Sequence, residues 1–383
     1  MLKLTIALRL SLVVRWLAGF VFHPSLALHW RQRLALTFLQ AQRVTFPTHT
    51  LRWLVRRVTS GQAIQQYCIR HGIPHQAITL ESTSTMHIGS TSTAELTIPP
   101  PTLHLLTPPG ATGNDTGTTL LYFHGGGFVN PLRGAAHMPF IMRCAAACRA
   151  KKVVVLEYAL APEHPYPAQL VQAVVALRHL LDDTALRPED IVLAGDSAGG
   201  QLVGALLAHL VRPSPYVPPV VMNGKFKAAL FVSPFVRLQN ADVASYASND
   251  GRDYLNRVQV DRFKAAWKGR EDEIWANLYG VDGADEIWAK VFTPGPEGLV
   301  SKVMLTVGTA EILLDCCRAF ANDYVQAETV AVTRDIDGRI FEGRNAVLVE
   351  CEGETHVQVA LDSVVGYEKG TKMRAIMVWL ATV

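Results

Sequence analysis

The chain has 383 residues, 49% of them hydrophobic, and a formal net charge of +3. This apolar content is enough for a large core, and the length suits a doubly wound α/β enzyme of about 300 residues with an added cap. The six cysteines show neither metal-ligand spacing nor a disulfide framework, so we expect buried free thiols, no metal site and a reducing intracellular compartment. The charge balance gives no reason to expect a nucleic-acid partner.

The N-terminal region carries an excess of positive charge. The first 80 residues contain ten Lys or Arg and no Asp or Glu, whereas the rest of the chain is acidic overall. Apolar stretches separated by Pro and Gly predict helices within residues 1–75. We therefore expect a basic, apolar, mainly helical segment over residues 1–98, followed by a catalytic domain over residues 99–383.

Three interpretations of this N-terminal segment stay open. Its helices can form a cap over the catalytic domain, or residues 1–60 can make a peripheral contact with an anionic membrane. A targeting or spanning segment is the third, but Arg9 and Arg15 interrupt the apolar residues 4–22, and a central Arg costs about 2.5–3.5 kcal/mol in a spanning helix. A secretory signal would need a cleavage site of small residues after the apolar region, and the sequence shows none. We therefore expect the protein in the cytoplasm or at the cytosolic face of a membrane.

Apolar strands alternate with helical segments through the rest of the chain. Strands are predicted at 119–123, 152–157, 190–194, 227–232, 302–307 and 346–351, and helices at 136–150, 168–182, 198–211 and 316–328. Such alternation predicts a mostly parallel, doubly wound sheet flanked by helices. The Ser/Thr-rich residues 82–97 are expected to form an edge strand or a loop.

A helical insertion at about 240–295 breaks this alternation. Its central part, residues 253–290, is rich in aromatic side chains, among them Phe263, Trp267 and Trp288. Together with the N-terminal helices, such an insertion can form a lid over a site at the edge of the sheet. Its aromatic residues can then line an apolar pocket. The alternative, that these residues pack the insertion's own small core, stays equally open.

A serine stands on a turn between a predicted strand and a predicted helix. The turn consists of Gly195, Asp196, Ser197, Ala198 and Gly199, which form the pattern Gly-x-Ser-x-Gly. Such a turn is strained and exposes the hydroxyl group, and it needs small residues two before and two after the serine. Ser197 is therefore the predicted nucleophile.

A run of glycines follows an earlier predicted strand. His124 precedes Gly125, Gly126 and Gly127, where backbone amides can approach a ligand with no side chain in the way. In acyl transfer the carbonyl oxygen becomes an oxyanion, and the loss of one amide donor aimed at it raises the barrier by roughly 3–4 kcal/mol. We expect the oxyanion donors from this run together with the amide of Ala198.

A base and an acid are expected downstream of the serine, because a serine nucleophile needs a base and the base needs an orienting carboxylate. The predicted strand at 302–307 leads into a segment with Glu311 and Asp315, and the last predicted strand leads into His356. The order serine, acid, histidine is that of α/β-hydrolases. Glu311 and Asp315 are four residues apart, so both can face the same way on a helix.

Three sequence blocks resemble the hormone-sensitive-lipase family of α/β-hydrolases. They are His-Gly-Gly-Gly-Phe at 124–128, the block at 158–168 that contains Ala-Pro-Glu-His-Pro, and Gly-Asp-Ser-Ala-Gly-Gly at 195–200. The resemblance covers about residues 100–383. It implies an α/β-hydrolase fold with a helical cap.

The resemblance also implies roles for individual residues. It places oxyanion donors at Gly126 and Gly127, with Ala198, and the catalytic acid at Glu311, with Asp315 as a structural or backup carboxylate. A glutamate at the acid position departs from the family's commonest pattern and adds one methylene of reach. No metal or organic cofactor is implied.

Together these features predict a serine carboxylic-ester hydrolase that acts through an acyl-enzyme on a small hydrophobic ester. The sequence looks similar to fungal members of the family, which implies a sterol-type or secondary-metabolite ester. Two alternatives stay open. The same triad can catalyse cyclisation or acyl transfer in a biosynthetic pathway, or the chain can be a receptor-like, ligand-binding module. All three triad positions are occupied, which disfavours the receptor-like module.

Overall fold

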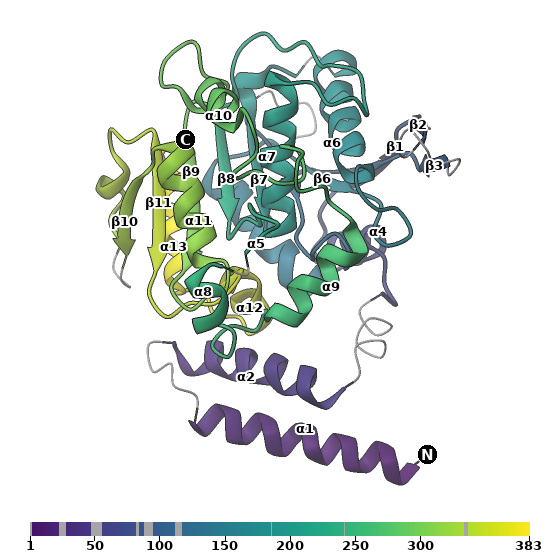
Figure 1. The fold of residues 1–383 in the computed structure, drawn as a ribbon, viewed down its shortest axis with the longest axis vertical. Helices are drawn as coiled ribbons and strands as arrows, with labels where there is room; N and C mark the ends of the chain where they lie inside the picture. Colours follow the sequence, from purple (N-terminus) through teal and green to yellow (C-terminus); the bar gives the residue numbers. More distant parts are fainter. Residues whose placement is uncertain are drawn as a thin grey trace.

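The computed structural model describes residues 2–22, 28–46, 56–81, 84–87, 95–111, 117–184, 186–240, 242–332 and 336–383. Within these residues, nine strands form one central sheet in the order β1-β4-β6-β5-β7-β8-β9-β11-β10 (Figure 1). The strands are β1 (His75–Thr79), β4 (Thr102–Leu106), β5 (Thr119–Phe123), β6 (Lys152–Glu157), β7 (Ile191–Asp196), β8 (Ala228–Val232), β9 (Val303–Gly308), β10 (Glu328–Val332) and β11 (Ala346–Cys351). Pairing is antiparallel at β1–β4 and β4–β6 and parallel from β6 to β10.

The six predicted strands are confirmed to within two residues at each end. The sheet also contains three strands that the sequence pattern did not indicate, β1, β4 and β10. Within residues 82–97 the structure describes a separate antiparallel hairpin of β2 (Ser84–His87) and β3 (Glu95–Ile98). The helix predicted to reach residue 328 is too long, because the chain leaves the helical conformation at Gln326, which has a left-handed φ of 52°.

Helices cover both faces of the sheet and divide the core into two clusters. Successive strand residues point to opposite faces, so Leu121 and Phe123 of β5 belong to one cluster, and Leu120 and Tyr122 to the other. The first cluster includes α6 (Ala168–Arg178), α7 (Ala198–Val211), α10 (Ala284–Phe292) and α11 (Leu314–Phe320). The second includes α4 (Ser60–His71), α5 (Gly134–Ala147), α12 (Gln358–Val364) and α13 (Thr371–Leu380). The doubly wound sheet is thereby confirmed.

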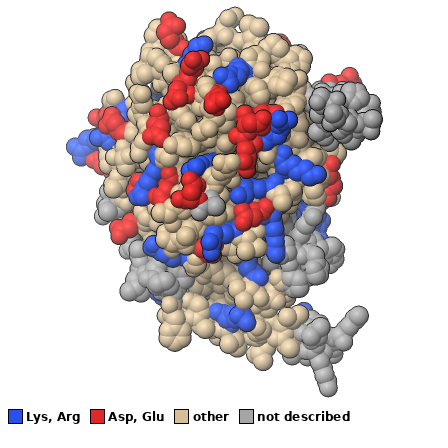
Figure 2. Space-filling view, in the orientation of Figure 1, with Lys and Arg blue, Asp and Glu red and all other residues tan. Residues whose placement is uncertain are grey.

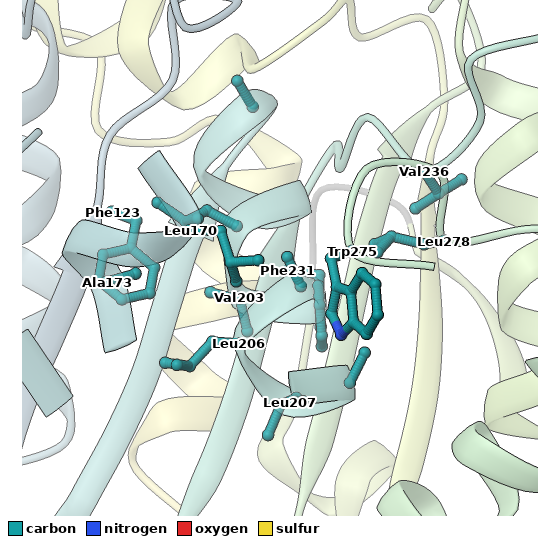
Figure 3. Close-up of a cluster of buried hydrophobic side chains, with 14 of the residues drawn as sticks. Phe123, Leu170, Ala173, Val203, Leu206, Leu207, Phe231, Val236, Trp275 and Leu278 are labelled. Carbon is teal, nitrogen blue, oxygen red and sulfur yellow. The ribbon is translucent and has the colours of Figure 1, made fainter. Parts of the chain in front are cut away.

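The aromatic residues of the insertion divide between the core and the site. Figure 3 shows Trp275 beside Leu207 of α7 and Phe231 of β8, within the first cluster. Trp288 on α10 is fully buried in the same cluster. The remaining insertion helices are α8 (Ala244–Ser248) and α9 (Arg257–Trp267), and α9 lies near the predicted site.

Two N-terminal helices lie outside the sheet and its covering helices. Figure 1 shows α2 (Trp30–Thr45) between α1 (Leu2–Phe22) and the rest of the molecule. α2 packs on α12, where Gln32 Nε2 donates to both carboxylate oxygens of Asp362, at 3.0 and 3.2 Å. Among the described residues, no helix combines the length and the apolar character that crossing a bilayer requires.

Candidate active site

Ser197 occupies a strained turn between β7 and α7. Its φ of 54° and ψ of −116° are rarely adopted by residues with a Cβ atom. A Cβ atom at Gly195 would lie 2.3 Å from the carbonyl oxygen of Gly199, and one at Gly199 would lie 1.9 Å from that of Phe123. Any larger residue at either position would therefore displace the backbone that holds the serine.

The structure brings Ser197, His356 and Glu311 together from three separate loops at the ends of β7, β11 and β9. His356 Nε2 lies 2.8 Å from Ser197 Oγ, and His356 Nδ1 lies 3.1 Å from Glu311 Oε2. All three side chains are buried. This arrangement lets the histidine accept the proton of the serine hydroxyl while the carboxylate orients the ring.

Glu311, and not Asp315, is the carboxylate that faces His356. α11 begins only at Leu314, so Glu311 lies in the turn before the helix and the two acids do not share a helix face. Asp315 instead accepts a hydrogen bond from the amide of Ser245 at 2.8 Å. The second oxygen of Glu311, Oε1, accepts bonds from the Gly308 amide at 2.6 Å and from Ser233 Oγ at 2.7 Å.

Two charged residues that the sequence analysis did not single out lie against this triad. Lys372 donates to Glu311 Oε1, and Asp253 accepts from the amides of Ile312 and His356, both at 3.1 Å. Burial alone would raise the pKa of the Glu311 carboxyl, but the Lys372 ammonium and His356 outweigh it and hold that pKa below its ordinary value. For Asp253 burial dominates and raises the pKa to about 6.

The glycine run after β5 forms a loop beside the serine. Gly126 and Gly127 have positive φ values of 123° and 63°, and Ala198 is the first residue of α7. In the part of the chain that the structure describes, the amides of these three residues donate to no protein acceptor. They are therefore available to a ligand oxygen.

Asp196 ties this loop to the serine turn. Its Oδ1 accepts hydrogen bonds from the amide of Gly125 at 2.9 Å and from the hydroxyl of Tyr122 at 2.6 Å. A Cβ atom at Gly125 would lie 2.2 Å from Asp196 Oδ2. The motif residues Gly125 and Asp196 thus place the two loops relative to each other.

His124 packs beneath the glycine loop through its buried ring. Its buried ring stacks on Tyr158 with centroids 4.3 Å apart, and its Nε2 lies 3.3 Å from Ser60 Oγ. Burial, together with the neighbouring His137, lowers the pKa of His124 to about 4. The ring is therefore neutral at physiological pH, as its fully buried position requires. Among the described residues, no group of three or more His, Cys, Asp or Glu side chains could hold a metal ion.

Aromatic side chains from α9 lie against the glycine loop. The Trp267 ring stacks on that of Phe128 with centroids 4.6 Å apart, and a Cβ atom at Gly127 would lie 2.5 Å from the ring of Phe263. On the other side, the ring of Tyr254 lies 6.0 Å from that of His356. Phe128 and Trp267 are themselves buried in the first core cluster, whereas Phe263 and Tyr254 remain partly exposed beside the glycine loop and the histidine.

A family model described as alpha/beta hydrolase fold matches residues 120–342. The chain belongs to this family. The α/β-hydrolase fold expected from the sequence is thereby confirmed, with the serine turn at the end of β7 and the histidine after β11.

Several curated proteins are similar to this chain. It is 31% identical over 196 residues to the carboxylesterase NlhH of Mycobacterium tuberculosis, covering 50% of this chain and 55% of that protein. It is 34% identical over 215 residues to an acetyl-hydrolase of Streptomyces hygroscopicus, covering 56% of this chain and 64% of that protein. The chain therefore spans about half the length of the curated relatives that it matches.

The structure is also similar to the solved structure of an esterase from the bacterial hormone-sensitive lipase family. That solved structure has a TM-score of 0.62 at 22% identity, covering 93% of this chain and 99% of the other. At this identity the likeness shows the shared fold. The α/β-hydrolase family expected from the motifs is confirmed by the family match, and the fold of this esterase agrees with it.

Proposed function

We propose that this protein is a serine carboxylic-ester hydrolase that acts through an acyl-enzyme. The observation that carries the proposal is the hydrogen-bonded series from Ser197 Oγ through the His356 ring to Glu311 Oε2. Ser197 Oγ attacks the ester carbonyl carbon as His356 Nε2 accepts its proton, and the amides of the glycine loop and Ala198 hold the oxyanion.

Collapse of this intermediate breaks the bond to the alcohol, which leaves with the proton from His356. Water then attacks the acyl group on Ser197, with His356 as the base, and the acid is released. Glu311 remains ionised throughout and stabilises the imidazolium that forms in each half of the reaction. Its depressed pKa supports this role.

We propose an apolar ester with a short to medium acyl group as the substrate, and a sterol-type or secondary-metabolite ester as the narrower class. The partly exposed rings of Phe263 beside the glycine loop and Tyr254 beside His356 favour an apolar ligand. The names of the similar proteins, a carboxylesterase and an acetyl-hydrolase, agree with an ester substrate.

Hydrolysis of p-nitrophenyl acetate, butyrate and octanoate by the wild type and by Ser197→Ala tests the proposal. We expect the variant to retain the circular dichroism and melting temperature of the wild type and to lose at least about 10³-fold in kcat/KM. Equal turnover by the two proteins would refute it. With ¹⁸O-labelled water, label in the acid product indicates hydrolysis, whereas an unlabelled ester or lactone product indicates acyl transfer or cyclisation.

We further propose that α1 lies on an anionic membrane surface. Five apolar side chains of α1 are between 44% and 66% exposed and recur at helical spacing along one side: Leu10, Val13, Val14, Leu17 and Val21. A stripe of this kind in contact with water is unfavourable by roughly 25 cal/mol for each Å² of apolar surface. A lipid surface would cover it.

The exposed apolar stripe is not needed to hold α1 against α2. The positive charge of the N-terminal region favours anionic lipid. The other side of α1 packs on α2, where Trp16 Nε1 donates to the carbonyl of Leu34 at 3.0 Å. Figure 2 shows basic and no acidic side chains over the α1 and α2 region, in keeping with the ten basic and no acidic residues of the first 80. Such helices bind anionic lipid surfaces.

Co-sedimentation with phosphatidylcholine vesicles, with and without phosphatidylserine, tests this contact. We expect the wild type to bind vesicles that contain phosphatidylserine, and Leu17→Glu to bind at least tenfold more weakly. Ile69→Glu, at a 74% exposed position on α4, is the matched control and should bind like the wild type. A wild type that ignores vesicles, or that uses this stripe to dimerise in their absence, would overturn the proposal.

A further inference from the structure

Lys372 on α13 is a fully buried lysine that contacts the triad carboxylate. Its Nζ donates to Glu311 Oε1, to Ser233 Oγ at 2.9 Å and to the carbonyl oxygen of Thr355 at 3.3 Å. An ammonium group has three N–H donors, so all of them are used. The side chain is therefore held in one orientation by groups that also hold the triad.

A buried charge of this kind is costly unless it is paired. Burial opposes the charged form of Lys372, but Glu311, Cys351 and Glu354 outweigh it and raise its pKa. The titratable groups that face Lys372, Glu311 or His356 from the surrounding elements are Asp253, Tyr254, Cys317, Cys351, Glu354 and, through Glu354, Asp362. Arg43 of α2, over the ring of Tyr254, is the other cation nearby.

We propose that Lys372 is a positioning residue that fixes Glu311 against His356 and sets the lower pH limit of the reaction. This inference rests on the proposed serine-hydrolase function. Lys372 and Ser233 both bind Oε1 of the carboxylate, which leaves Oε2 directed at His356 Nδ1. The longer side chain of a glutamate at this position is thus held in place at its carboxylate.

The charge of Lys372 has a second effect, on proton uptake. A cation beside the Glu311–His356 pair makes the addition of a proton to that pair less favourable. Protonation of the pair as a whole, which removes the base, is therefore expected at a lower pH with Lys372 present than without it. The direction of this effect does not depend on which member of the pair takes up the proton.

The test compares pH profiles of kcat/KM, whose acidic limb reports protonation of the base in the free enzyme. Lys372→Gln keeps a hydrogen-bond donor but removes the charge, and Lys372→Met removes both. We expect both variants to move the acidic limb to higher pH by about one unit. The comparison variant is Ser233→Ala, which removes a hydrogen bond to Glu311 Oε1 without changing the charge and should move the limb in the same direction by less than half as much.

The rate at which a fluorophosphonate labels Ser197 gives the same information without turnover. It distinguishes failure of this inference from failure of the proposed function, because labelling needs the serine and histidine but no ester substrate. A folded Lys372→Gln whose acidic limb coincides with that of the wild type in both assays overturns the inference. A shift of equal size in Ser233→Ala also overturns it, since it would show that lost packing and not lost charge moves the limb.

Discussion

A Cβ atom at Gly127 would lie 2.5 Å from two ring carbons of Phe263, closer than real side chains approach one another. Gly127 belongs to the proposed oxyanion loop and Phe263 to α9 of the insertion. The ring of Phe263 therefore packs directly on the loop backbone and leaves no room for a side chain at Gly127, and the φ of 63° at Gly127 adds a second reason for glycine.

This contact predicts a large kinetic effect of a single methyl group. Gly127→Ala should lower kcat/KM by about 10²-fold, because the loop must shift and misplace an oxyanion donor. Adding Phe263→Ala removes the clash and should restore part of the loss, leaving the strain of a positive φ. Steady-state kinetics of the two single variants and the double variant form the cycle, and purely additive losses would contradict the prediction.

The two acidic residues after β9 should respond very differently to loss of charge. Glu311→Gln places an amide against His356 Nδ1 and should lower kcat by roughly 10³- to 10⁴-fold, and it should also destabilise the protein because Lys372 loses its buried partner. Asp315→Asn alters the contacts with Ser245 and Arg318, neither of which touches the triad, and should keep kcat within about threefold while costing about 1 kcal/mol of stability. Measured kcat values in the reverse order would show that the acid was assigned wrongly.

Asp253 should make the folded protein less stable at neutral pH than at mildly acidic pH. Burial raises its pKa from 3.8 to about 6, so the folded state holds a proton that the unfolded state has released. The contribution is fully present below pH 4 and is lost as the pH rises through 6. A difference of about two pH units corresponds to roughly 3 kcal/mol.

Urea unfolding of the wild type and of Asp253→Asn between pH 4 and pH 8 measures this contribution. The free energy of unfolding of the wild type should fall relative to that of the variant as the pH rises. A constant offset between the two curves would reflect only the altered hydrogen bonds to Ile312 and His356, and would contradict the raised pKa.

The cysteines should be inert in the folded protein. All six are free and buried, and burial raises the pKa of Cys68 and Cys148 to about 11 and that of Cys316 to about 12. Since the thiolate is the reactive species, we expect Ellman's reagent at pH 8 to detect no fast-reacting thiol before unfolding and six after it. A rapidly reacting thiol in the native protein would refute this.

The core strands and the serine turn were predictable because their physical requirements are local. β5, β7 and β9 are short runs in which every residue is buried and most are apolar, as expected of strands covered on both faces. Gly195 is set by a backbone contact with Gly199 in the same turn, whereas Gly199, which the serine pattern indicated, also faces the carbonyl oxygen of Phe123 at the end of β5. The spacing of the six cysteines in the sequence suits neither a disulfide framework nor a metal site. The expectation of buried free thiols that followed from this spacing is confirmed.

β10 and the charged neighbours of the triad were not predictable from local pattern. β10 lies outside β11 at the sheet edge, although it precedes β11 in the chain, and its alternately exposed residues lack an apolar run. A lysine in the last helix, such as Lys372, is normally expected at the surface. Its burial depends on Glu311, 61 residues earlier, a contact that no local spacing encodes.

The contacts of α2 bear on how the substrate range of this protein can evolve. Gln40 donates to the carbonyl oxygens of Gly251 and Asp253, and Gln32 donates to Asp362 on the helix that follows His356. Mutations in α2 are therefore expected to disturb the segments that support His356 as well. Changes in α2 and in its partners should accumulate in pairs, and an α2 exchanged without those partners should displace the histidine.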